Sequence, residues 1–342
     1  MNTTRLTTTA KALVSEGKGI LAMDESNPTC NKRFAALEIP QSEESRRAYR
    51  ELVVTTPKLS DCISGAILYE ETIHQGTKGG IPFLKVLADA GILPGVKVDT
   101  GKKAMASHPG EKLTEGLEGL PERLDEYFQM GARFTKWRAV LSIGEGTPSR
   151  DCIEANAHAL ARFAKMSQEA GLVPIVEPEV LMSGGHTLAR CRKVTAEMLA
   201  NVFHQLESTG VALSGLLLKP NMLLSGLACP TQASIDEVAD ATVSSLFANV
   251  PAAVSGIVFL SGGQSPELAT ARLNAMNAKY KSQAPWELSF SFGRAIQQPA
   301  LDTWAGKVAN VSAAQQALLH RAQCNGAARR GAYLPSMELN AS

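Results

Sequence analysis

The stretch GLLLKPNML, residues 215–223, places a lysine directly after three leucines and directly before a proline. Consecutive leucines are typical of a buried strand, so Lys219 stands where such a strand would end. The simplest interpretation is an exposed lysine, because lysine side chains usually extend their ammonium groups into water. A functional interpretation depends on whether other strands end in the same way.

Seven other short apolar runs are spaced along the chain. Helical patterns with start and stop signals separate most of them, as in residues 42–54, 152–170 and 234–250. Eight strands that alternate with helices predict a parallel sheet in one domain. The eight runs are GILAMDES (19–26), GAILYEET (65–72), GVKVD (95–99), RFTKWRAVL (133–141), LVPIVEPEV (172–180), GLLLKPNM (215–222), VSGIVFLSGG (254–263) and WELSFSFGR (286–294).

The number of strands favours a closed (β/α)8 barrel, the TIM-barrel form of the α/β class. An open doubly wound sheet would carry a glycine-rich dinucleotide turn after its first strand, but residues 23–30 read MDESNPTC. We therefore expect residues 1–342 to form a single barrel domain with extra helices at both ends. Residues 331–342 would form a short C-terminal tail.

Composition limits the partners that the protein can have. The 34 basic and 33 acidic residues are interspersed and give a net charge of +1, so we expect neither a nucleic-acid partner nor a membrane partner. The six cysteines are scattered without a CxxC pair, which predicts reduced thiols and a cytoplasmic location. A plastid stroma would fit equally if a transit peptide has been removed.

Polar residues recur in pairs near the carboxyl ends of five predicted strands. The two members of each pair are two residues apart, so their side chains would point to the same side of the sheet. In a barrel that shared side is the interior, where catalytic groups collect at the carboxyl ends of the strands. The pairs are Asp24 and Ser26, Lys97 and Asp99, Lys136 and Arg138, Glu177 and Glu179, and Lys219 and Asn221.

The last two strands end in small residues instead. SGGQS (261–265) and SFGR (291–294) offer backbone N–H groups, hydroxyls and one arginine, which suit a phosphate group. The loops after strands seven and eight are also the usual phosphate position in this barrel. The histidines show neither HxH nor HExxH spacing, so the sequence predicts no metal and no cofactor.

A lysine inside such a cluster can become a nucleophile. An ordinary lysine, with a pKa of about 10.4, is almost wholly protonated at pH 7. An apolar wall and the neighbouring Lys136 would lower the pKa of Lys219 by about three units. The free amine can then form a Schiff base with a ketone, while nearby glutamates move the protons needed to lose water.

Together these motifs resemble the class I fructose-1,6-bisphosphate aldolases over nearly the whole chain, from GILAMDES through VKVDTG, TKWR, IVEPEV, LLLKPNM and FLSGGQS to FSFGRA. The resemblance implies a metal-independent lyase, usually a homotetramer. It also implies reversible cleavage of the sugar phosphate fructose 1,6-bisphosphate to dihydroxyacetone phosphate and glyceraldehyde 3-phosphate. Glycolysis, gluconeogenesis or the Calvin cycle would use this reaction.

The resemblance also implies roles for individual residues. Lys219 would form the Schiff base, Glu177 would act as acid and base with Glu179 in support, Asp24 would take the C4-hydroxyl proton, and Lys136 would stabilise developing charge. Lys97 and Arg138 would complete the polar cluster. One phosphate would contact Ser261, Gly262, Gly263, Ser291, Gly293 and Arg294; the other would contact Ser26, Thr29, Lys32 and Arg33.

Two features differ from many family members. Their terminal tyrosine, which assists proton transfer, has no counterpart at Ser342, and we expect no such role for Tyr333. The first loop, SNPTCNKR (26–33), is similar to the plastid-type members. Two alternatives stay open from the residues alone: a transaldolase-like transferase, which also forms a Schiff base, and a non-catalytic module that binds sugar phosphates or acidic proteins.

Overall fold

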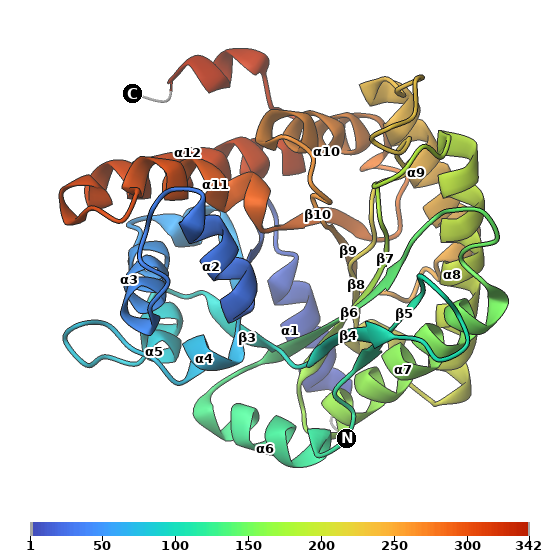
Figure 1. The fold of residues 1–342 in the computed structure, drawn as a ribbon, viewed down its shortest axis with the longest axis horizontal. Coiled ribbons are helices and arrows are strands. Elements are labelled where there is room, and N and C mark those ends of the chain that lie inside the picture. The colour runs from blue at the N-terminus through green and yellow to red at the C-terminus, as the bar shows by residue number, and fades with distance from the viewer. Residues whose placement is uncertain (1–2, 341–342) are drawn as a thin grey trace.

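The structure, a computed structural model, describes residues 3–340 and contains a closed barrel of eight parallel strands (Figure 1). Each strand overlaps one of the eight predicted runs, so the predicted barrel is confirmed. Around the ring the order is β1, β10, β9, β8, β7, β6, β3 and β2. The strands are β1 (Gly19–Met23), β2 (Ile63–Leu68), β3 (Leu93–Lys97), β6 (Phe134–Leu141), β7 (Val173–Val180), β8 (Leu217–Leu218), β9 (Gly256–Phe259) and β10 (Glu287–Phe292).

The helices surround this ring, and several begin where the sequence predicted. The Ser42 side chain accepts a hydrogen bond from the backbone N–H of Ser45, and Ser234 forms a complete capping box with Glu237. The helices are α1 (Thr3–Leu13), α2 (Asn27–Ala35), α3 (Glu43–Val54), α4 (Glu70–Ile73), α5 (Phe83–Asp89), α6 (Leu120–Met130), α7 (Arg150–Glu169), α8 (Leu188–Ser208), α9 (Ile235–Asn249), α10 (Pro266–Tyr280), α11 (Arg294–Trp304) and α12 (Val311–Arg329). Short 3-10 turns are η1 (Leu59–Asp61), η2 (Leu213–Gly215), η3 (Val308–Asn310) and η4 (Pro335–Asn340).

Helix α1 closes the end of the barrel at which the strands begin. Its buried residues Leu6, Ala10 and Leu13 recur at helical spacing, so they share one face. This face packs with interior side chains such as Phe134 in an apolar cluster inside the ring. A Cβ atom added at Gly65 would lie 2.6 Å from Leu13 Cδ2, so glycine lets the helix approach the strand. The interior is therefore dry at this end.

A two-stranded antiparallel sheet, β4 (Gly101–Ala104) and β5 (Lys112–Glu115), follows β3 outside the ring, and the sequence did not predict it. At the other end of the chain η4 contacts α12, because Glu338 accepts a hydrogen bond from Arg321 of that helix as well as one from Tyr333. Residues 1–2 of the predicted domain and 341–342 of the predicted tail lie outside the described residues. Across residues 3–340, no helix is long and apolar enough to cross a membrane.

We expect Gly95→Ala to destabilise the barrel. The added Cβ would lie 2.4 Å from Phe134 Cε2, so the buried ring must move from its place in the interior. Overpacking of this kind costs about 1–3 kcal/mol of unfolding free energy, which urea denaturation would measure. Gly79→Ala is the matched control, because its nearest atom would be Thr77 Oγ1 at 3.7 Å and its effect should stay within about 0.5 kcal/mol. Equal unfolding midpoints for the two variants would contradict this account.

Candidate active site

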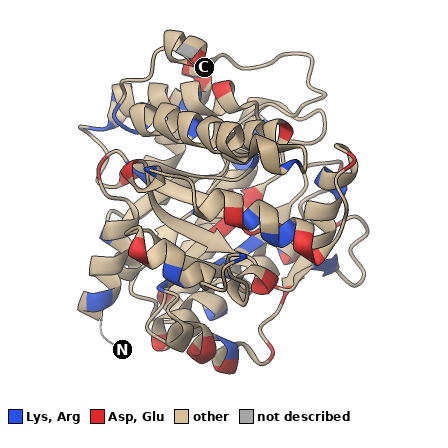
Figure 2. Ribbon diagram, turned by 90° about the vertical axis from the view of Figure 1, so that its left-hand side faces the viewer, with Lys and Arg blue, Asp and Glu red and all other residues tan. Residues whose placement is uncertain are grey.

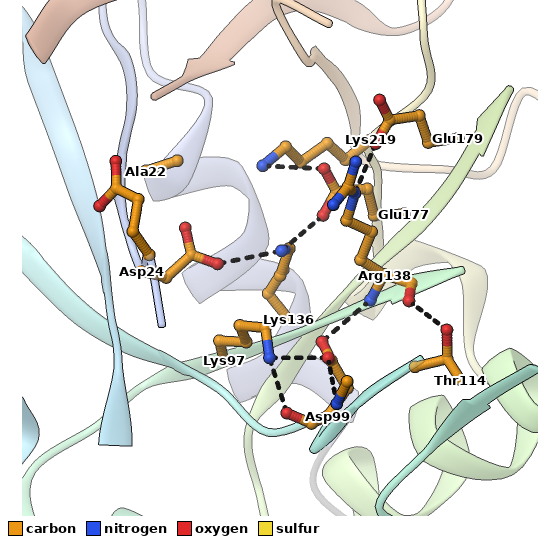
Figure 3. Close-up of polar contacts among 12 residues, drawn as sticks. Ala22, Asp24, Lys97, Asp99, Thr114, Lys136, Arg138, Glu177, Glu179 and Lys219 are labelled. Carbon is orange, nitrogen blue, oxygen red and sulfur yellow. Dashed lines mark hydrogen bonds and ion pairs between the residues drawn. The ribbon is translucent and has the colours of Figure 1, made fainter. Parts of the chain in front are cut away.

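A cavity of about 590 Å³ opens at the end of the barrel where the strands finish. It gathers side chains from every strand of the ring or from the loop that follows it, which is the arrangement that the spaced pairs predicted. Figure 3 shows its central polar contacts. The predicted residues that line the cavity are Asp24, Ser26, Thr29, Lys97, Lys136, Arg138, Glu177, Glu179, Lys219, Ser261, Gly262, Ser291, Gly293 and Arg294.

Lys219 lies at the centre of a connected row of charges. Its Nζ atom is 3.2 Å from Glu177 Oε1, and the other oxygen of Glu177 is 2.8 Å from Lys136 Nζ. Lys136 Nζ also donates a hydrogen bond to Asp24 Oδ2 at 3.0 Å (Figure 3). Only 3% of the surface of Lys219 is exposed, so the interpretation as a solvated lysine is wrong.

The position of Lys219 favours a neutral amine. The residue follows β8 directly, and its backbone N–H continues the ladder by donating to the carbonyl of Val176 at 2.8 Å. Burial lowers the pKa of Lys219 below its ordinary value, and the nearby Lys136 lowers it further, whereas Glu177 opposes both effects. The site thus destabilises the ammonium form of the one lysine that a Schiff base would need as a free amine.

The other three charges of the row stay ionised. Burial alone would raise the pKa of Glu177 and of Asp24, but the adjacent lysines outweigh it and hold both pKa values below their ordinary range. Burial alone would lower the pKa of Lys136, but Asp24 and Glu177 raise it well above that of a free lysine. Lys136 is therefore a permanent cation, and Lys219 is the lysine of the pair that can lose its proton.

A second group of contacts lies beside this row, towards β3 and β5. Lys97 Nζ is 2.7 Å from Asp99 Oδ1, and the other carboxylate oxygen of Asp99 accepts a hydrogen bond from the backbone N–H of Arg138. The Arg138 guanidinium pairs with Glu179, and its carbonyl accepts a hydrogen bond from the Thr114 hydroxyl at 2.8 Å. These pairs neutralise one another, as the sequence interpretation required.

The opposite wall has the features of an anion site. Gly262 and Gly263 both have positive φ angles, of 60° and 92°, which glycine adopts without strain. A Cβ atom at Gly263 would lie 3.1 Å from Arg294 Nη2, so Gly263 packs against the guanidinium without lining the cavity. Ser291 Oγ, which faces this cavity, is buried without a hydrogen-bond partner among the described residues and can bond to a ligand.

Lys32 and Arg33 do not line the cavity. Both lie on α2, where Lys32 is exposed, and Arg33 is held by Glu25 at 2.7 Å and by Gln298 at 3.1 Å. Glu25 also binds Arg50 at 2.8 Å, so this network turns Arg33 away from the cavity. A neutralised arginine is less available to a phosphate than a free one.

The structure also corrects one pair and adds residues to the site. Asn221 does not share the cavity with Lys219, because its side chain accepts a hydrogen bond from the backbone N–H of Val180 at 2.9 Å. Tyr69, Lys102 and Thr114 line the cavity although the sequence interpretation missed them. Tyr69 could have been found, since it lies inside the predicted run GAILYEET and directly follows β2, whereas the other two lie on the unpredicted β4 and β5.

Charges elsewhere suggest no competing site. Basic and acidic residues are interspersed along the ribbon (Figure 2), in agreement with the composition. Within residues 3–340, one group of potential metal ligands has its atoms within 4.8 Å of one another: His320, Cys324 and Glu338. None of the three lines the cavity, and Glu338 is already bound by Arg321 and Tyr333.

Comparisons with known proteins agree on one family. A family model described as fructose-bisphosphate aldolase class-I matches residues 5–342. A probable fructose-bisphosphate aldolase class 1 from Xanthomonas campestris is 54% identical over 334 residues, which cover 97% of this chain and 99% of the relative. The cytosolic fructose-bisphosphate aldolase 6 of Arabidopsis thaliana is 51% identical over 317 residues, which cover 93% of this chain and 88% of the relative.

A solved structure is also similar. Plasmodium falciparum fructose-bisphosphate aldolase, in complex with TRAP and a small-molecule inhibitor, superposes with a TM-score of 0.95 at 46% identity. The match covers 97% of this chain and 96% of that one.

Replacing Lys136 should raise the pKa of Lys219. In Lys136→Met the neighbouring cation is lost while Glu177 remains, so the ammonium form of Lys219 gains stability. The pH midpoint for acetylation of Lys219 by acetic anhydride, followed by peptide mass spectrometry, should move upward. Exposed Lys58 serves as the internal reference in the same digest. An unchanged or lower midpoint for Lys219 would show that Lys136 does not control this amine.

Proposed function

This chain belongs to the class I fructose-bisphosphate aldolase family, and on that premise we propose that Lys219 forms the Schiff base of the family's reaction. The enzyme is a carbon–carbon lyase that acts on a sugar phosphate, and its reaction is the reversible cleavage of fructose 1,6-bisphosphate. Membership of this family favours an aldolase over the transferase and the non-catalytic alternatives. The observation that supports Lys219 is its buried Nζ atom, 3.2 Å from Glu177 and beside the cation Lys136.

In the first step we assign proton transfer to Glu177. The neutral amine of Lys219 adds to the C2 carbonyl of the substrate, and Glu177 accepts the proton that the nitrogen loses and passes it to the former carbonyl oxygen, which gives the carbinolamine. Glu177 then takes up a second proton from solvent and donates it to the C2 hydroxyl, which leaves as water and gives the iminium. Lys219 no longer carries an ammonium at the carbinolamine stage, so one of the three cations that lower the pKa of Glu177 is absent when the carboxylate has to hold a proton.

In the second step we assign Asp24 as the base that takes the C4-hydroxyl proton. The C3–C4 bond breaks, its electron pair moves to the iminium nitrogen, and glyceraldehyde 3-phosphate leaves. Lys136, 3.0 Å from Asp24 and 2.8 Å from Glu177, would stabilise the charge that develops between them. Protonation of the remaining enamine at C3 and hydrolysis of the imine then release dihydroxyacetone phosphate.

We propose that the phosphate next to the imine binds at the ends of β9 and β10. Lys219 follows β8, the neighbour of β9 in the ring, so a C1 phosphate on a C2 imine lies within reach of Ser261, the backbone N–H groups of Gly262 and Gly263, and Arg294. Ser291 and Gly293 would complete this subsite. Lys97, Arg138 and Glu179 would orient the hydroxyls and charges around the sugar. Ser26 and Thr29, which line the cavity, remain candidates for contacts to the other phosphate. Lys32 and Arg33 would contact that phosphate only after a rearrangement of α2.

Further proposals concern the whole molecule. We propose a single barrel domain over residues 1–342 with a C-terminal tail at 331–342, a metal-independent mechanism and a homotetramer, which is the usual assembly in the family that the sequence resembles. A cytoplasmic location is supported by the relative named as cytosolic and by six buried cysteines that are free of disulfides.

Reductive trapping tests the nucleophile. With dihydroxyacetone phosphate and borohydride, we expect one covalent adduct, mapped to Lys219 by peptide mass spectrometry and formed equally in the presence of a chelator. Lys219→Met should give no adduct while keeping the circular dichroism spectrum of a folded barrel. An adduct on another lysine, or none on the folded unmodified protein, would refute the assignment.

Replacing the proposed acid–base group should reduce the rate of dehydration strongly and the affinity for the substrate only slightly. For Glu177→Gln we expect kcat to fall about 10²- to 10⁴-fold, because the amide cannot move a proton, while KM changes little. Steady-state cleavage of fructose 1,6-bisphosphate gives both constants. Glu25→Gln is unsuitable as a control because Glu25 anchors two arginines, so exposed Glu70→Gln at the cavity rim is used and should keep a near-normal kcat.

A further inference from the structure

Most of the positive charge in the cavity is already neutralised. Among the described residues, Lys97, Lys136, Arg138 and Lys219 each form an ion pair within the cavity wall. Two basic side chains that line the same cavity, Lys102 and Arg294, appear in no ion pair with a described carboxylate. The complete set of basic residues in the lining is Lys97, Lys102, Lys136, Arg138, Lys219 and Arg294.

These two unpaired cations lie on opposite sides of the barrel. Arg294 begins α11 directly after β10, beside the Gly-Gly turn that follows β9. Lys102 lies on β4, which directly follows β3. In the ring of eight strands β3 is three positions from β10 and four positions from β9. A ligand that spans the cavity can therefore meet one free cation at each end.

The register of the small sheet directs Lys102 into the cavity. Lys102 is paired with Thr114 of β5, which also lines the cavity and whose hydroxyl donates to the carbonyl of Arg138 at 2.8 Å (Figure 3). Side chains alternate along a strand, so the next residue, Lys103, points the other way, where it forms an ion pair with Glu115 at 2.6 Å. Lys102 and Lys103 thus differ in direction although they are adjacent in sequence.

The surroundings of Lys102 contain an excess of positive charge. Burial lowers its pKa first, and the cations Arg138 and Lys112 lower it further, while Glu179 opposes them. Glu179 is itself paired with Arg138 and cannot neutralise both cations. An anion placed beside Lys102 would relieve this repulsion and complete the charge balance.

We propose that Lys102 binds the second phosphate of the substrate, at the end of the cavity opposite Arg294. The inference rests on the proposed function, in which the imine at C2 holds the first phosphate at the ends of β9 and β10. The six-carbon substrate then directs its other phosphate away from these strands, towards the β3 side. An ammonium group that lacks a carboxylate partner can give a charge-assisted hydrogen bond to that phosphate. Lys102 is thus a residue that determines the preference for a bisphosphate.

The test compares two substrates that differ in the second phosphate. For Lys102→Met we expect the ratio of kcat/KM for fructose 1,6-bisphosphate to kcat/KM for fructose 1-phosphate to fall about 10- to 100-fold, as loss of a charge-assisted hydrogen bond predicts. This fall in the ratio should come mainly from a higher KM for the bisphosphate. Lys103→Met, on the outward face of the same strand, is the matched control and should keep the ratio of the unmodified enzyme.

The remaining outcomes separate this proposal from the proposed function. Arg294→Met should weaken the binding of both substrates, since both carry the phosphate next to the imine. A Lys102→Met enzyme that keeps the ratio, or loses both activities equally, would overturn the role of Lys102. Trapping with dihydroxyacetone phosphate, which lacks the second phosphate, should still label Lys219 in that variant. Absence of label even in the unmodified enzyme would instead refute the proposed function.

Discussion

The carboxylate of Glu177 lies between two buried ammonium groups, and the rest of the site depends on this contact. Its two oxygens are 3.2 Å from Lys219 and 2.8 Å from Lys136. A buried carboxylate that pairs with a single cation would keep that cation charged. Here Lys136 also pairs with Asp24, and the two carboxylates keep it charged. Lys219 shares its one close carboxylate with a stronger competitor, so burial acts on it with little compensation. The competition lowers the pKa of Lys219 and raises that of Lys136, although both are lysines.

Much of this arrangement could be predicted from the sequence because a period of two is easy to recognise. The pairs at Lys136 and Arg138 and at Glu177 and Glu179 lie inside long strands, where alternation fixes the direction of each side chain, and all four line the cavity. The same rule failed for Asn221. The strand β8 ends at Leu218, so by Asn221 the chain has left the ladder and alternation no longer decides where a side chain points.

Other parts of the site could not be predicted for a different physical reason. The sheet of β4 and β5 is polar and largely exposed, so it has no apolar pattern, and the direction of Lys102 depends on its pairing with Thr114. Arg33 lies on α2, and only the family resemblance implied that it contacts a phosphate. Its pairing with Glu25 and Gln298 comes from contacts between residues far apart in the chain, which a local pattern does not contain.

The closed end of the barrel and the charge row together explain how one site can disfavour an ammonium ion and still favour an iminium ion. Helix α1 and the side chains around Phe134 form an apolar layer at the strand starts, and burial lowers the pKa of Lys219. With Lys219 neutral, Asp24 and Glu177 carry two negative charges against the single positive charge of Lys136. In the proposed reaction the iminium restores the missing positive charge at the same nitrogen, and it has one N–H group to hydrogen-bond where an ammonium has three. Burial therefore acts mainly against the ammonium, whereas the excess negative charge supports the iminium.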